Sequence, residues 1–144
     1  MNVLFLDTEF NGFTGQLLSM ALVPLDDALP SFYKELEVHE PLNPWVKENV
    51  VPHLVLNPVS RKVFQDSLAE YLWRIGPVKI IADWPDDIRH FCESLIVCPG
   101  QMLSFMHTMQ FELDTWLLYD SEVPHSALHD AIGMKDAYIA RGTK

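Results

Sequence analysis

The stretch "FLDTEFNG", residues 5–12, completes an apolar run that begins at Val3 and predicts a buried strand ending in a turn. Asp7 and Glu9 are two residues apart, so on a strand their side chains point to one face, in line with Phe5. Two like charges side by side repel, and a divalent cation bound between them would offset that repulsion. Two explanations stay open, a strand end in water or a pair of metal ligands.

The residues after this strand predict an antiparallel meander. A first strand over 2–7 is followed by a glycine-containing hairpin turn at 11–15. A second apolar strand over 16–25 ends near Pro24, and the alternating segment 31–38 predicts a third strand. The sequence therefore begins with one small antiparallel sheet.

Helical patterns then alternate with short apolar strands. The expected elements are helices over 43–51, 60–76, 85–96 and 126–141, strands over 78–83 and around 102–106, and a helical turn near 114–119. This order predicts an α/β fold with a mixed sheet and flanking helices. A chain of 144 residues fits a single domain spanning 1–144.

Composition excludes several classes of protein. With 49% hydrophobic and 21% charged residues the chain is globular, and no stretch approaches a membrane span or a signal peptide. Two cysteines, Cys92 and Cys98, are too few for a disulfide framework and predict reduced thiols in a cytoplasmic protein. The net charge of −10 argues against tight binding of long duplexes, but not against an enzyme that engages phosphates through metal ions.

Three more acids lie in "IIADWPDDIRHFCESL", residues 80–95. Asp83 stands where the strand ends and can cap the following helix. Asp86 and Asp87 lie in the first turn, where the helix dipole favours acids. Asp87 comes one turn before Phe91 and so borders the buried stripe of that helix, whereas Asp86 is expected to point away.

The segment "VPHSALHDAIGMKDAYIAR", residues 123–141, places an acid among apolar residues. Asp130 is three residues after Ala127 and four before Met134, so it falls on the inward stripe of the helix. A buried carboxylate without a partner is costly, and a metal ion shared with Asp7 would be a suitable partner. On the same helix His129 and Asp136 are off the stripe, and both are expected to be exposed.

Together these motifs resemble the DEDDh branch of the 3′–5′ exonucleases, which have the ribonuclease H-like fold. The pair "DTE" ends the first strand, an aspartate opens a helix in mid-chain, and "HSALHDA" is similar to the branch's third motif, H-N-A-x-x-D-A. The three occur in the branch's order across nearly the whole chain. The segments "DTEFNGFTGQLLSMALV" and "NPWVKENVVP" are similar to the small exoribonuclease-like subfamily.

The resemblance implies a catalytic site with two bound divalent cations, Mg²⁺ or Mn²⁺. Asp7, Glu9 and Asp130 would hold them together with one acid of the second motif. The usual spacing of that motif selects Asp87, although the doubled aspartate leaves Asp83 as an alternative. His125 would be the general base, which suits a side chain that titrates near neutral pH.

The implied activity is hydrolysis of phosphodiester bonds at the 3′ end of single-stranded RNA or short oligonucleotides by a two-metal mechanism. Phe10 and Phe13 are candidates to stack on the terminal base, and the backbone N–H of Thr8 is a candidate to meet the terminal nucleotide. The alternatives are an exonuclease on single-stranded DNA, an inactive nucleic-acid-binding module on the same fold, and an acidic interaction protein. Relatives in the branch often work as homodimers, so the resemblance also implies a possible homodimer.

Overall fold

The structure is a computed structural model that describes residues 1–105 and 107–142. Its elements, in chain order, are β1 (Asn2–Phe10), β2 (Leu17–Pro24), β3 (Phe32–Leu36), α1 (Pro44–Asn49), the short 3-10 helix η1 (Val51–His53), β4 (Pro58–Val59), α2 (Arg61–Ile75), β5 (Val78–Ala82), α3 (Pro85–Ser94), β6 (Ile96–Cys98), β7 (Gln101–Met102), β8 (Met109–Leu113) and α4 (Ala127–Gly142). The α/β class predicted from the sequence is confirmed.

The main sheet is mixed and has six strands in the order β4-β3-β2-β1-β5-β8. β1, β2 and β3 pair antiparallel, which confirms the predicted meander. β5 pairs parallel to β1, and β8 pairs parallel to β5. Because β1 and β5 are parallel neighbours, the residues that follow their carboxyl ends lie at one edge of the sheet.

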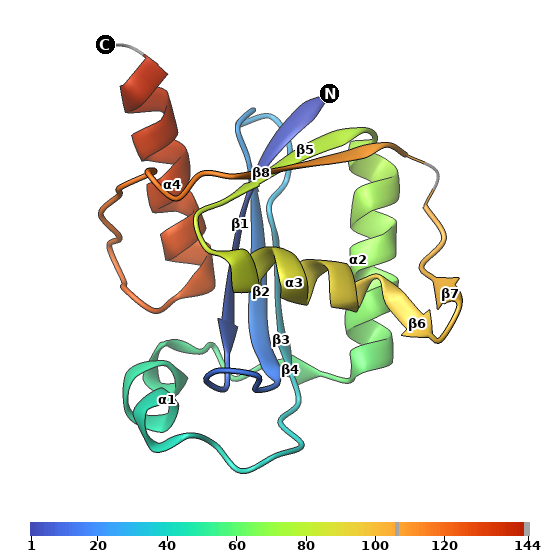
Figure 1. Cartoon of the computed structure of the whole chain (residues 1–144), viewed down its shortest axis with the longest axis vertical. Coiled ribbons are helices and arrows are strands. Elements are labelled where there is room, and N and C mark those ends of the chain that lie inside the picture. Colours follow the sequence, from blue (N-terminus) through green and yellow to red (C-terminus); the bar gives the residue numbers. More distant parts are fainter. Residues whose placement is uncertain (106, 143–144) are drawn as a thin grey trace.

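Helices cover both faces of the sheet (Figure 1). α4 packs on one face, where Phe5 and Ile81 of the sheet meet Ala131 and Met134 of the helix. α2 and α3 pack on the other face against a larger cluster. That cluster contains Leu4, Leu6, Leu22, Ile80, Phe64, Leu68, Leu72 and Phe91, all at most 1% exposed. Alternate residues of β1 therefore serve two different cores.

Polar side chains cap the N-termini of two helices, as the sequence predicted. The Asn43 side chain accepts from the N–H of Trp45 at the start of α1, and the Ser60 hydroxyl accepts from the N–H of Val63 at the start of α2. At α3 the N-cap residue is Trp84, and no side chain caps the helix. Asp83 therefore has no capping role.

The sequence predictions were wrong in the region after β6. The expected strand around 102–106 is not formed, because only Gln101–Met102 is extended, in a short ribbon with β6; residue 106 lies outside the described residues. The sixth strand of the sheet is β8, an edge strand whose half-exposed residues show no clear alternation. In place of a helical turn near 114–119, the Asp114 carboxylate accepts from the N–H of Trp116 and makes a local turn.

Smaller predictions had mixed outcomes. The spacing of apolar residues in α2 predicts that Val63 is buried, but its side chain is 47% exposed. The buried face of α2 includes Gln65 in its place. His129 was expected to be exposed, but it is half-buried and bonded to the Ser126 hydroxyl. Cys92 and Cys98 are free thiols, as predicted. Among the described residues, no helix is long and apolar enough to cross a membrane.

Candidate metal centre

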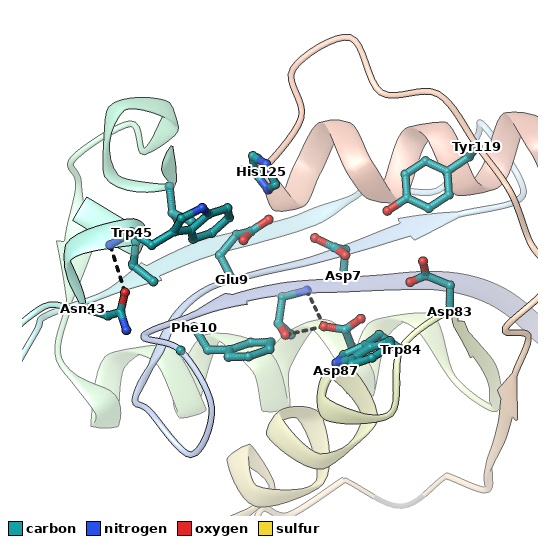
Figure 2. Close-up of a pocket in the computed structure, with 14 residues that line it drawn as sticks. Asp7, Glu9, Phe10, Asn43, Trp45, Asp83, Trp84, Asp87, Tyr119 and His125 are labelled. Atoms are coloured by element: carbon teal, nitrogen blue, oxygen red, sulfur yellow. Dashed lines mark hydrogen bonds between the residues drawn. The ribbon is translucent and has the colours of Figure 1, made fainter. Parts of the chain in front are cut away.

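Carboxylates from β1, the β5–α3 junction, α3 and α4 meet at the carboxyl edge of β1 and β5. Asp7 lies on β1 and is 7% exposed, and Glu9, two residues on, is half-buried on the same face. Asp83 follows β5 directly, and its half-buried side chain points toward Asp7 (Figure 2). The strand register explains why Asp7 and Asp83 lie close together. The last residue pair between β1 and β5 is Phe5 with Ile81, and each acid follows its own member of this pair by two residues.

Asp87 is delivered from the first turn of α3 and is held in place by Thr8. One carboxylate oxygen, Oδ1, accepts both the Thr8 hydroxyl at 2.6 Å and the Thr8 backbone N–H at 3.2 Å. Asp87 is 2% exposed and Thr8 is 4% exposed, so these bonds are screened from water. The Thr8 N–H predicted to meet a nucleotide is therefore already engaged, and Thr8 instead positions a carboxylate.

Asp130 comes from the first turn of α4. It is 9% exposed and lies on the inward face between the buried Ala127 and Ala131, as the spacing predicted. Its backbone N–H bonds to the carbonyl of Ser126, so the carboxylate projects from regular helix. α4 thus delivers an acid to the face of the sheet that carries Asp7 and Glu9.

The five acids form two groups that share Asp7. Within each group, one carboxylate oxygen of each residue lies within 4.8 Å of those of the other two. One group is Asp7, Asp83 and Asp87, and the other is Asp7, Glu9 and Asp130. The sequence left open whether Asp83 or Asp87 belongs to the site, and the structure brings both beside Asp7.

Burial raises the pKa values of all five acids, and repulsion from neighbouring acids adds to it at Asp7, Glu9, Asp83 and Asp87. Burial is the largest cause at each of them, and at Asp7 the charges of Asp87, Glu9 and Asp130 add to it. The pKa of Glu9 rises to about 8 and that of Asp87 to about 7. At neutral pH the site therefore resists carrying its full negative charge unless a cation binds.

Two oxygens of the site have no hydrogen-bond partner among the described residues. Asp7 Oδ2 and Asp130 Oδ1 are buried and accept no hydrogen bond from any described residue. Buried polar atoms without a partner are rare, and each calls for an explanation. Oxygen-rich ligand sets suit Mg²⁺ and Mn²⁺, so the donor set and its unpaired oxygens fit divalent cations.

His125 stands at the rim of this acidic cluster. It precedes α4, adopts a left-handed backbone conformation with φ 67°, and has an exposed side chain. Its ring meets the edge of the Trp45 ring at a centroid distance of 5.1 Å. In Figure 2 the imidazole lies on the Glu9 side of the cluster. The His125 ring therefore lies on the Glu9 side of the acids and is open to solvent.

The acids open onto a pocket of about 640 Å³. Aromatic and aliphatic side chains form the part of the wall away from the acids, and the lining there includes Phe10, Trp45, Val46 and Val50. Among the described residues, none of the 14 that line the pocket is a lysine or an arginine. A phosphate in this pocket would meet acids and rings but no cationic side chain.

The predicted substrate residues fall at different places. Phe10 lines the pocket, and its ring stacks on the buried His90 with centroids 4.7 Å apart. Phe13 lies on the hairpin after β1, is 88% exposed and does not line the pocket. Trp84, just before α3, also lines the pocket, with its side chain 58% exposed.

Two aromatic residues of the pocket, Trp45 and Tyr119, were not predicted as site residues from the sequence. Trp45 follows Asn43 and Pro44 at the start of α1. The sequence indicated that a helix starts there, but it did not indicate which residues the Trp45 ring would contact. Tyr119 lies in an irregular loop, where periodicity gives no signal. No model of a known protein family matches the chain, and no curated protein matches it.

Proposed function

We propose that the protein is a metal-dependent 3′–5′ exonuclease of the DEDDh type on a ribonuclease H-like fold. The observation that carries the proposal is Asp7, which is buried, belongs to both acid groups and keeps one oxygen unpaired. The mixed sheet, with an antiparallel meander followed by parallel strands, agrees with that fold. The direction of digestion and the preference for RNA derive from the sequence resemblance.

Each acid has a stated part in this proposal. Asp7 would bridge two divalent cations, Glu9 and Asp130 would hold one of them, and Asp83 and Asp87 would hold the other. Two bound cations supply an activated water and offset the charge that develops on the leaving oxygen. Thr8 fixes the second-motif carboxylate in one orientation through its two hydrogen bonds.

His125 is the proposed general base. Its exposed ring lies beside Glu9, where an imidazole nitrogen can take a proton from the attacking water and pass it to solvent. The edge contact with Trp45 limits the positions of the ring.

The pocket favours a single-stranded end as substrate. Phe10 and Trp45 offer ring faces or edges to an unstacked base, and such contacts are worth about 1–3 kcal/mol per base. The lining contains no cation among the described residues, and the chain carries a net charge of −10. Long duplexes, whose binding depends on many phosphate contacts, are therefore disfavoured.

The test is a time course on a 5′-labelled single-stranded RNA and on the DNA of the same sequence, with Mg²⁺, Mn²⁺ or EDTA. Wild-type protein should give a ladder that shortens from the 3′ end, lost with EDTA and in Asp7→Asn. Asp136→Asn makes the same change at an exposed acid of α4 and should digest like wild type. Binding of either strand without any digestion by folded wild-type protein would reject the enzyme and favour the inactive binding module.

A further inference from the structure

Tyr119 lies on the loop between β8 and α4, outside the acid motifs and outside the His125 segment. Its side chain lines the pocket together with Asp7 and Asp83. Figure 2 shows the phenol group directed toward the gap between these two carboxylates. The hydroxyl makes no hydrogen bond to any described residue.

The ring of Tyr119 is held by a glycine in the middle of α4. A Cβ added at Gly133 would lie 2.8 Å from Cδ2 of Tyr119 and 2.4 Å from the carbonyl oxygen of Asp120. Glycine inside a helix costs about 1 kcal/mol relative to alanine, so this position gives up helix stability for the close approach. The ring is also packed against the core cluster that includes Met134. Tyr119 is therefore directed into the pocket by rigid surroundings.

His125 and Tyr119 approach the acids from different sides. His125 lies on the side of Glu9, and Tyr119 lies on the side of Asp83 (Figure 2). The two acid groups divide in the same way, since Glu9 belongs to one group and Asp83 to the other. In-line displacement at phosphorus needs an attacking side and a leaving side. With the proposed general base on the Glu9 side, the Asp83 side is left for the departing oxygen.

We propose that Tyr119 is a catalytic residue that donates a hydrogen bond from its phenol to the departing 3′-oxygen. The inference rests on the proposed exonuclease function. Water forms the new P–O bond and gives one proton to His125, while the P–O3′ bond breaks and its electron pair stays on the 3′-oxygen. That oxygen takes its proton from solvent, and the phenol keeps its own.

The character of the phenol suits this role. A tyrosine hydroxyl is a neutral donor that brings no further charge into a cluster of acids. The ordinary pKa of a tyrosine phenol is about 10, so the donor proton is retained at neutral pH. The described lining has no lysine or arginine that could supply the same hydrogen bond.

The experiment compares two leaving groups in single turnovers of wild type, Tyr119→Phe and His125→Ala. One substrate is a single-stranded RNA, whose 3′-oxygen leaves as a strongly basic alkoxide. The other is a p-nitrophenyl ester of a nucleoside 5′-monophosphate, whose weakly basic leaving group needs no donor. Tyr119→Phe should slow RNA cleavage by about 10²-fold, the cost of losing one such donor, and change ester cleavage less than about threefold. His125→Ala should slow both.

Calorimetry supplies a readout independent of turnover. Tyr119→Phe should bind Mn²⁺ and nucleoside 5′-monophosphate within about twofold of wild type, because the donor acts on a charge that develops only in the transition state. Phenylalanine keeps the ring on Gly133, so the fold is preserved. Tyr138→Phe removes a second half-buried phenol, on α4 in the core that contains Phe5, and should resemble wild type in every assay.

The outcomes separate the two proposals. Equal slowing of both substrates, no slowing of either, or weaker Mn²⁺ binding by Tyr119→Phe would overturn the role at the leaving oxygen while the exonuclease function stands. Wild-type protein that cleaves neither substrate would reject the exonuclease itself, and the role of Tyr119 with it. Slowing confined to RNA, with unchanged Mn²⁺ binding, supports the inference.

Discussion

The acids at the edge of β1 should make the metal-free protein less stable than a variant with one acid neutralised. Glu9→Gln is the sharpest such change, because it removes one ionisable group with little change in shape. Burial and the charges of Asp130 and Asp87 raise the pKa of Glu9 from 4.5 to about 8. A group whose pKa is raised on folding contributes stability below its unfolded pKa and loses that contribution as the pH rises toward the folded value.

The size of the effect follows from the two pKa values. At pH 7 an unfolded glutamate is ionised, whereas Glu9 in the fold, with a pKa of about 8, is mostly protonated. Taking up that proton costs 1.36 kcal/mol for each pH unit above 4.5, or about 3 kcal/mol at pH 7. Glutamine avoids this cost. For a chain of this length the gain corresponds to a rise in melting temperature of about 10 °C.

The assay is thermal and urea unfolding of metal-free wild type and Glu9→Gln at pH 4 and pH 7. The variant should be more stable at pH 7, and the difference should nearly vanish at pH 4. Glu48→Gln makes the same chemical change at an exposed residue of α1 and should show neither effect. Saturating Mg²⁺ should stabilise wild type at pH 7 by about 3 kcal/mol at a hundredfold excess over Kd, and Glu9→Gln much less. Equal stability of wild type and Glu9→Gln at pH 7 would refute the electrostatic reasoning.

Three further predictions concern neighbours of the acids. Thr8→Val should lower metal affinity by about 10- to 100-fold in calorimetry, because it removes the hydroxyl that fixes the Asp87 carboxylate, while Thr8→Ser should keep it. Gly133→Ala should unfold more easily in urea despite the better helix propensity of alanine, whereas Gly142→Ala, with nothing within 4 Å, should not be destabilised. Trp45→Ala should raise KM for RNA about tenfold or more through the lost stacking contact and leave the Mg²⁺ shift of the melting temperature unchanged.

The sequence predicted the elements whose patterns are local. β1 and α4 carry clear periodicities, so the burial of Asp7 and Asp130 could be inferred from the residues around them. The cap of α2 and its end at Gly76 were also predictable, since both depend on residue types at fixed offsets. β1 and α4 thus carry Asp7 and Asp130, which are the most buried acids of the cluster after Asp87.

The parts that could not be predicted depend on contacts between distant segments. β8 is recognisable as a strand only through its pairing with β5, because its exposed edge position removes the alternation of buried and exposed residues. The engagement of the Thr8 N–H depends on Asp87, 79 residues later in the chain. The position of the Tyr119 ring depends on the space left by the missing side chain of Gly133. Helix propensity alone gives no reason for a glycine at that position of α4. The arrangement of the candidate site therefore depends largely on contacts between segments that are far apart in the sequence.

The charge distribution of the pocket couples cation binding to substrate binding. Four acids, Asp7, Glu9, Asp83 and Asp87, and no described lysine or arginine line the pocket, so a phosphate entering it without a cation would meet repulsion. A cation held by Asp7, as proposed, would change the sign of that interaction. Linkage would then require the reverse effect, so that a bound nucleotide would tighten the binding of the cation by the same factor. If the acids destabilise the metal-free fold, as Glu9→Gln would reveal, the same repulsion would make the affinity for a nucleotide conditional on the metal.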